Sequence, residues 1–218
     1  MAERLKIDFV SDIVCPWCII GLKGLQVALK RLDGEVTADI RFHPFELNPD
    51  MEPQGQNLGE HLAQKYGSTP EQSAANRAMI KDRAAALGFD ITMTADSRMY
   101  NSFDAHRLLC WAAEEGGQAD LKLAMFEAYF THGLNVADHS VLLGAVAKAG
   151  LDIERALTIL ESDEFAAAVR SEEALWQSRG INSVPAVVVN GKYLISGGQP
   201  PEAFEQALRK IATESRSV

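Results

Sequence analysis

The sequence has little cysteine, no block of basic residues and no long apolar run. Only 3 of the 218 residues are Cys, which excludes a scaffold held together by several disulfides. Lys and Arg number 21 against 30 Asp and Glu, so the formal net charge is −9. This balance gives no electrostatic support for binding nucleic-acid phosphates. A membrane-spanning helix needs about 18 consecutive apolar residues, and no such run is present. We therefore expect neither nucleic acid nor a membrane as a partner.

The remaining composition is that of an ordinary folded domain, with 47% apolar and 23% charged residues. Charged residues at Glu3, Arg4, Lys6 and Asp8 interrupt any apolar stretch of a signal peptide. As given, the chain is expected to be cytoplasmic, where thiols are normally kept reduced. Two of the three cysteines nevertheless stand together as CPWC over residues 15–18. This pair is the feature of the sequence that calls for an explanation.

The first 43 residues predict a strand, a helix and a second strand. Alternating apolar residues predict strands over 5–10 and 36–42. Between them an apolar stripe at helical spacing predicts a helix that begins at the CPWC motif, where Pro16 suits the first turn. The stripe consists of Leu22, Leu25, Ala28, Leu29 and Leu32.

The middle of the chain predicts helices and the end predicts a hairpin and a last helix. Residues 56–179 read as almost wholly helical, with Asp138 as one N-cap and with helices closed at Gly88, Gly116, Gly133, Gly150 and Gly180. The β-branched run 185–189 is followed by Asn190-Gly191, which is a strong hairpin signal, and Pro200-Pro201 begins the last helix. We predict an α/β domain formed by residues 1–55 and 163–218, with an all-α domain inserted over residues 56–162.

A CxxC pair at the start of a helix is suited to disulfide exchange. The unsatisfied N–H groups and the positive end of the helix dipole favour the thiolate of Cys15 over its thiol. The thiolate is the nucleophile in exchange, and Cys18, one turn further on, can attack the mixed disulfide that results.

Two other interpretations of this cysteine pair have less support. A structural zinc site needs four ligands, and the sequence holds no second CxxC or Cys/His pair at finger spacing. Two inert core cysteines are the other alternative, against which the Pro and the helix start argue. A CxxC beside a βαβ pattern is instead typical of a thioredoxin-like redox site, so no metal is expected. A second clue is Val184-Pro185, which lies directly before the hairpin; the position alone does not establish a cis bond.

Several stretches resemble the DsbA family of thioredoxin-fold oxidoreductases. Within that family they are similar to the FrnE-like branch, which is related to the 2-hydroxychromene-2-carboxylate isomerases and the kappa-class glutathione transferases. The stretches are SDIVCPWCIIG (11–21), HPFELNPD (43–50), NSFDAHRLLCWA (101–112) and INSVPAVVVNGKYLISGGQP (181–200). The resemblance implies a thioredoxin-like fold, βαβ…ββα, around the inserted helices.

The resemblance also implies roles for individual residues. Cys15 matches the nucleophile, Cys18 the resolving cysteine, and Pro185, preceded by Val184, the cis-proline that faces the CxxC. Asn101 and His106 match a polar pair near the interface between insertion and thioredoxin domain, which makes them candidates for substrate binding.

Departures from the relatives narrow the function. The isomerases and transferases typically carry a serine at the nucleophile position, whereas this chain has Cys15 and retains Cys18. Some FrnE relatives have a further cysteine pair near the C-terminus, but no cysteine follows Cys110 here. Both features favour dithiol–disulfide chemistry that needs no second pair.

This fold also leads us to expect a proton acceptor for Cys18. Asp8, on the strand before the motif, and Asp12, closer in sequence, are the candidates. A solvated Asp8 and a loop or cap role for Asp12 are the alternatives. His106 is either a group beside the substrate or an ordinary helix histidine, and Cys110 is expected to be a buried apolar residue.

The sequence therefore predicts a thiol–disulfide oxidoreductase or isomerase that acts on protein or small disulfides without a cofactor beyond its own redox-active disulfide. Electrons would come from glutathione or a thioredoxin-type protein. One alternative is a glutathione-dependent isomerase or transferase, with glutathione as co-substrate. Another is a redox-sensing binding module.

The residue pair between the two cysteines predicts a moderate reduction potential. DsbA-type oxidants usually carry Pro-His, whose imidazole helps to stabilise the thiolate, whereas Trp17 is neutral. We predict a potential more negative than the value of about −120 mV of the strong periplasmic oxidant. Equilibration of the protein with glutathione redox buffers measures it, and a value near that of the oxidant would contradict the prediction.

Overall fold

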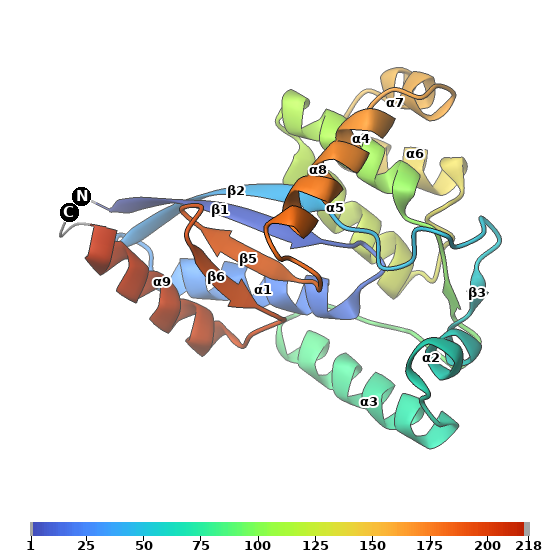
Figure 1. Ribbon diagram of the computed structural model, residues 1–218, viewed down its shortest axis with the longest axis horizontal. Helices are drawn as coiled ribbons and strands as arrows, with labels where there is room; N and C mark the ends of the chain where they lie inside the picture. The colour runs from blue at the N-terminus through green and yellow to red at the C-terminus, as the bar shows by residue number, and fades with distance from the viewer. Residues whose placement is uncertain (1, 216–218) are drawn as a thin grey trace.

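A four-stranded sheet brings together the two ends of the chain. The computed structural model describes residues 2–215. Its main sheet has the order β2-β1-β5-β6 (Figure 1). These strands are β1 (Glu3–Ser11), β2 (Val36–Pro44), β5 (Ala186–Val189) and β6 (Tyr193–Ser196). β1 pairs with β2 in parallel and with β5 in antiparallel fashion, and β5 and β6 form the hairpin that Asn190-Gly191 predicts. The expected strands are thus confirmed.

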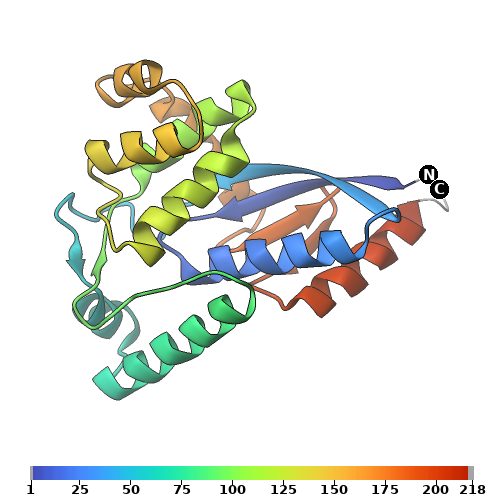
Figure 2. The same ribbon diagram turned by 180° about the vertical axis from the view of Figure 1, so that it is seen from behind.

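Helices cover both faces of this sheet because its central strand is apolar on both sides. α1 (Pro16–Arg31) and α9 (Pro201–Ser215) lie side by side on one face, while α8 (Ala166–Ser178) crosses the other (Figures 1 and 2). Ile7 and Phe9 of β1 are buried in the cluster that contains α1 and α9. Val10 is buried on the opposite face with Trp176 of α8. The fold is the mixed α/β, thioredoxin-like arrangement that the sequence predicts.

The remaining elements lie between β2 and α8 in the chain. They are β3 (Gln56–Asn57), α2 (Leu58–Tyr66), α3 (Pro70–Ala86), β4 (Arg98–Met99), α4 (Phe103–Glu115), α5 (Gln118–Phe126), the π-helical segment η1 (Glu127–Thr131), α6 (His139–Lys148) and α7 (Ile153–Leu160). α4, α5, α6 and α7 pack together at one end of the sheet, and α3 runs beside α1 (Figure 2). Within residues 2–215, no helix combines the length and apolar character needed to cross a bilayer.

The expected helix boundaries are mostly confirmed. All five glycines expected to end helices have positive φ, between 65° at Gly133 and 85° at Gly180. The Asp138 side chain accepts a hydrogen bond from the Ser140 N–H at the start of α6. The expectation of almost continuous helix is wrong for residues 87–102, which contain β4 and irregular chain. There Ile91 and Met93 are both buried, and such burial of alternate residues is typical of extended backbone.

Both chain ends contribute strands to the sheet, which agrees with an insertion between them. β1 and β2 come from the first 44 residues, and β5 and β6 from residues 186–196. The domain limits at residues 55/56 and 162/163 stay a prediction.

Candidate active site

The CPWC motif lies where β1 gives way to α1. Cys15 is the N-cap residue of α1, and Pro16 is the first residue of the helix, as the sequence predicts. The Cys18 N–H donates to the Cys15 carbonyl at 3.0 Å, so the first turn closes directly behind Cys15. The Cys15 side chain makes no capping hydrogen bond within the described chain. The Cys15 side chain therefore stands at the N-terminal end of α1, where the positive end of a helix dipole lies.

The two sulfur atoms differ in access and environment. Both thiols are free; Cys15 is 4% exposed and Cys18 is 0% exposed. Burial and the neighbouring Cys15 sulfur raise the pKa of the Cys18 thiol well above its usual range, while a backbone hydrogen bond at Asp12 and the charge of Lys122 oppose this. Cys15 is thus the sulfur that a substrate can reach, and Cys18 is a protected thiol behind it.

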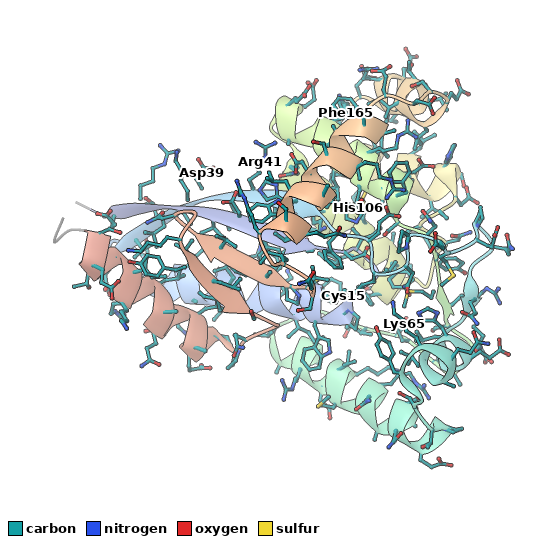
Figure 3. The ribbon with its side chains drawn as sticks, viewed as in Figure 1. Cys15, Asp39, Arg41, Lys65, His106 and Phe165 are labelled. Atoms are coloured by element: carbon teal, nitrogen blue, oxygen red, sulfur yellow. The ribbon has the colours of Figure 1, made fainter. Side chains whose placement is uncertain are left out.

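The segment before β5 faces the motif from the other side. The Val184–Pro185 peptide bond is cis, and the Cys15 Sγ lies 3.8 Å from the Val184 carbonyl oxygen. Figure 3 shows Cys15 at the end of the sheet where α1 begins. Gly21 of α1 allows the close approach, because a Cβ there would meet Pro185 Cγ and Gly198 Cα at 3.2 Å. The sequence-distant residues Cys15, Val184 and Pro185 are therefore neighbours.

Trp17 joins the motif to the inserted segment. Its side chain packs against the main core, and the Arg83 guanidinium of α3 lies 5.2 Å from its ring centre. On the other side, a Cβ on Gly198 would come within 2.8 Å of the Trp17 carbonyl oxygen. Trp17 is therefore held between α3 and the loop before α9.

Asp12 is a buried carboxylate directly before the motif. It is 0% exposed, and its oxygens accept hydrogen bonds from the N–H groups of Val14 (3.4 Å) and Leu47 (2.8 Å). His106 Nε2 lies 3.4 Å from Asp12 Oδ1. Burial raises the pKa of Asp12, but His106, Leu47 and Ser102 together bring it below its usual value. Asp12 thus remains ionised in the core beside the motif.

Asp8 lies on the face of the sheet away from α1. Its Oδ1 is 2.8 Å from His43 Nε2, and His43 Nδ1 is 2.8 Å from Glu172 of α8. Its neighbours Ile7 and Phe9 are the residues that turn toward α1. The role of Asp8 as a base for Cys18 stays a prediction.

Asn101 and His106 occupy different surroundings. The Asn101 amide donates to the carbonyls of Pro49 and Met51 at 3.4 and 3.2 Å, and its Oδ1 accepts from the Phe103 N–H at 2.8 Å. Asn101 therefore ties the segment after β2 to the start of α4. His106 is 1% exposed, on α4 beside Asp12. Their part in substrate binding stays a prediction.

The sequence patterns did not identify two charged groups near the motif. The first is Lys122 of α5. The residue is 0% exposed, and its Nζ has no hydrogen-bond partner within residues 2–215. Burial lowers the pKa of Lys122 to about 8, although the nearby Cys18, Asp12 and Cys15 raise it. The available signal was its place in α5, next to Leu121 and four residues before Phe126, on the apolar side of the helix.

A cavity of about 690 Å³ opens beside Cys15. Its walls come from the motif, α2, α3 and residues 182–184, and the Lys65 label in Figure 3 marks the α2 side. Among its lining residues are Cys15, Trp17, Leu62, Met79, Met93 and Val184. The volume is in the range of small-molecule sites, about 300–1,000 Å³. Neither Asn101 nor His106 belongs to the described lining.

Glu46 is the second missed group and lies in the wall of this cavity. Its side chain is 2% exposed and pairs with Arg170 of α8, while its N–H donates to Glu173 at 3.0 Å. The Glu46 Oε2 has no hydrogen-bond partner in the described part of the chain. Burial and the charge of Glu173 raise the pKa of Glu46 to about 7, against the opposing effect of Arg170. The stretch HPFELNPD, which contains Glu46, is marked in the sequence only by its resemblance to the DsbA family.

Cys110 is the third thiol and lies one turn beyond His106 on α4. It is partly buried, and burial together with the charge of Glu172 raises its pKa to about 12. A thiol of this kind is a poor nucleophile at neutral pH. No group of three or more His, Cys, Asp or Glu residues in a metal-binding arrangement occurs within residues 2–215.

Residues 6–209 match the family model of the DSBA-like thioredoxin domain. The chain is 25% identical over 205 residues to YwbO of Bacillus subtilis, a protein described as uncharacterized; the match covers 94% of this chain and 96% of YwbO. The probable DsbA oxidoreductase SCO1869 from Streptomyces coelicolor is 32% identical. Its crystal structure matches with a TM-score of 0.89 over 94% of this chain and 89% of that one.

More distant structures share the fold. The cytosolic disulfide reductase DsbM from Pseudomonas aeruginosa, solved with GSH, is 18% identical with a TM-score of 0.63, over 94% of this chain and 98% of that one. A 2-hydroxychromene-2-carboxylate isomerase is 16% identical with a TM-score of 0.70, over 97% and 98%.

The raised pKa of Glu46 predicts that stability falls as the pH rises from about 5 to about 7. In this range the folded protein holds a proton on Glu46 that the unfolded chain has released, so deprotonation favours unfolding. We expect Glu46→Gln to remove this loss, which is on the order of 1–3 kcal/mol. Urea unfolding across the pH range measures it, with the exposed Glu114→Gln as the control. An unchanged pH dependence in Glu46→Gln would contradict the assignment.

Proposed function

Because the chain belongs to the DSBA-like thioredoxin domain family, we propose that it is a thiol–disulfide oxidoreductase whose working pair is Cys15 and Cys18. The observation that carries this proposal is the position of Cys15. Its sulfur lies in front of the N-terminus of α1, 3.8 Å from the Val184 carbonyl, in the wall of the cavity. Cys18 lies behind it in the same helical turn and is fully buried.

The reaction has two exchange steps. The Cys15 thiolate attacks one sulfur of the substrate disulfide, which forms a mixed disulfide and releases the other sulfur as a thiolate. The Cys18 sulfur then attacks the Cys15 sulfur, the mixed disulfide breaks, and the second substrate thiol leaves. The proton of Cys18 ends on that departing sulfur. The substrate has gained two electrons and the Cys18 proton, the first thiolate released takes its proton from water, and the enzyme holds a Cys15–Cys18 disulfide.

The difference in burial supports this division of roles. Cys15 lines the cavity and Cys18 does not. Because a second substrate molecule cannot reach the Cys18 thiol, this thiol reacts only with the mixed disulfide at Cys15. The raised pKa of Cys18 also keeps it protonated until Cys15 has reacted. Attack at Cys15 followed by resolution at Cys18 is therefore the favoured order.

The cavity suits the part of the substrate next to its disulfide. Its lining is largely apolar, with Leu62 and Met79 among the side chains, and Lys65 and Arg77 add positive charge. A small disulfide, or an apolar side chain next to a protein disulfide, fits such a site. We propose reduction or isomerisation as the direction, with glutathione or a thioredoxin-type protein as electron donor.

A glutathione-dependent isomerase is the second candidate, because a largely apolar cavity beside a nucleophile also suits a small substrate held next to glutathione. The two functions differ in their need for Cys18. Dithiol exchange requires it to complete a turnover. Isomerisation with glutathione bound at residue 15 does not.

Replacement of Cys18 separates the two functions. For an oxidoreductase, we expect Cys18→Ser to lower the turnover of insulin or glutathione disulfide by on the order of 100-fold, because resolution is lost. The same variant should accumulate a glutathione adduct on Cys15 after addition of glutathione disulfide. Intact-protein mass spectrometry detects the adduct, and Cys15→Ser should form none.

Cys110→Ser is the matched control, since it removes a thiol with a high pKa that lies outside the cavity lining. Disulfide turnover that is absent in the unaltered protein would contradict the proposal. Isomerase turnover that survives Cys18→Ser would favour the second candidate.

A further inference from the structure

Lys122 is a buried lysine without a hydrogen-bond partner. It is 0% exposed in the middle of α5, and none of residues 2–215 accepts a hydrogen bond from its Nζ. Its ammonium lies over two aromatic rings, 5.9 Å from the centre of Phe42 and 5.3 Å from that of Phe126. Two such contacts only partly offset the loss of water around the charge. A buried charge of this kind lowers the stability of the fold. The neighbouring residues indicate which function it can serve.

The surroundings of Lys122 connect it to the site. Lys122 lines a narrow gap together with His43, His106 and Cys110, and the gap has no room for a water molecule. His106 lies 3.4 Å from Asp12. The Asp12 carbonyl in turn accepts a hydrogen bond from the Cys15 N–H at 3.3 Å. The gap beside Lys122 therefore borders His106, which in turn lies next to Asp12 and the motif.

Electrostatic interactions agree with this placement. The charge of Lys122 opposes the rise in the pKa of Cys18. In return, four groups oppose the fall in the pKa of Lys122: Cys18, Asp12, Cys15 and Cys110. Of these, Cys18 is the fully buried thiol that must lose a proton during exchange. In surroundings without water, a fixed positive charge has a long reach, because little screens it. Lys122 is the cation that lowers the pKa of Cys18.

We propose that Lys122 is a positioning residue for the resolving step, and that its buried charge stabilises the Cys18 thiolate while it attacks the mixed disulfide. The proposal rests on the function proposed above. In this step the Cys18–Cys15 bond forms and the bond from Cys15 to the substrate sulfur breaks. The Cys18 proton passes to the departing thiolate, and no electron or proton remains on Lys122. The amine acts through its charge and makes no bond to the reacting atoms.

An apolar residue at this place would be expected to leave the fold at least as stable. Removal of a buried charge by an apolar side chain of similar volume is often neutral or stabilising. Lys122→Met keeps the length of the side chain and removes the charge. A variant that is stable but slow in resolution would distinguish a functional lysine from one that serves packing.

The test is a two-phase reaction with dithiobis(nitrobenzoic acid), whose thiolate product is coloured. Cys15 attacks the reagent in a first phase whose rate rises with reagent concentration. Cys18 then releases a second coloured thiolate at a rate independent of reagent concentration. Cys18→Ser should lack the second phase, which assigns it. The pKa of Cys110 is raised to about 12, so we expect this thiol to react with the reagent more slowly than either phase, and Cys110→Ser removes any contribution from it.

We expect Lys122→Met to slow the second phase about tenfold at neutral pH and to move the midpoint of its pH profile upward, since one pKa unit changes the thiolate fraction tenfold. The first phase should change less. Lys148→Met is the matched control, because Lys148 is an exposed lysine paired with Glu127 on the outer surface. It should leave both phases and the midpoint unchanged.

Leu121→Ala controls for damage to packing, since Leu121 is the buried neighbour on the same helix. It should lower the unfolding temperature without moving the pH midpoint. An equal shift of the midpoint in Leu121→Ala and Lys122→Met would overturn the inference, as would an unchanged second phase in Lys122→Met. An unaltered protein without any concentration-independent phase would instead contradict the proposed oxidoreductase function and, with it, this inference.

Discussion

The antiparallel pairing of β1 with β5 is the contact on which the site depends. It joins segments about 180 residues apart, with Ile7 opposite Val189 and Val10 opposite Ala186. β1 leads into the CPWC motif, and Val184 and Pro185 lie directly before β5. The register of these two strands therefore places the Val184 carbonyl beside the Cys15 sulfur. A slip of one residue would exchange the β5 side chains between the two core clusters and move Val184 away from Cys15.

Much of this arrangement could be predicted from the sequence because it follows local rules. Strand alternation, the Pro at the helix start and Asn190-Gly191 each indicate one element. The glycines at the helix ends do the same. In the irregular chain over residues 87–102, apolar residues from Leu87 to Met93 stand two apart, but the helical patterns on both sides obscure this short alternation. Ile91 and Met93 line the cavity together with residues of α2 and α3, and a local pattern does not reveal that contact.

In the candidate site, too, some residues could be predicted from local patterns and others could not. Cys15, Cys18 and Pro185 stand in recognisable motifs, whereas Lys122 and Glu46 are single charged residues in segments otherwise read as helix or connector. Their importance comes from what packs around them: two aromatic rings for Lys122, and Arg170 with Glu173 for Glu46. A buried charge is defined by tertiary contacts, so neither spacing nor composition identifies it.

The double contact of Trp17 has a consequence for attempts to exchange motifs among relatives. The two residues between the cysteines are commonly treated as a freely replaceable unit that tunes the sulfur chemistry. Here the indole ring also supports the Arg83 guanidinium of α3, and the Trp17 carbonyl packs against Gly198. A transplanted dipeptide would change how α3 rests on the motif, and with it the shape of the cavity that α3 helps to form. In this chain, a change of the residues between the cysteines therefore alters both the redox chemistry of the sulfur atoms and the fit of the substrate.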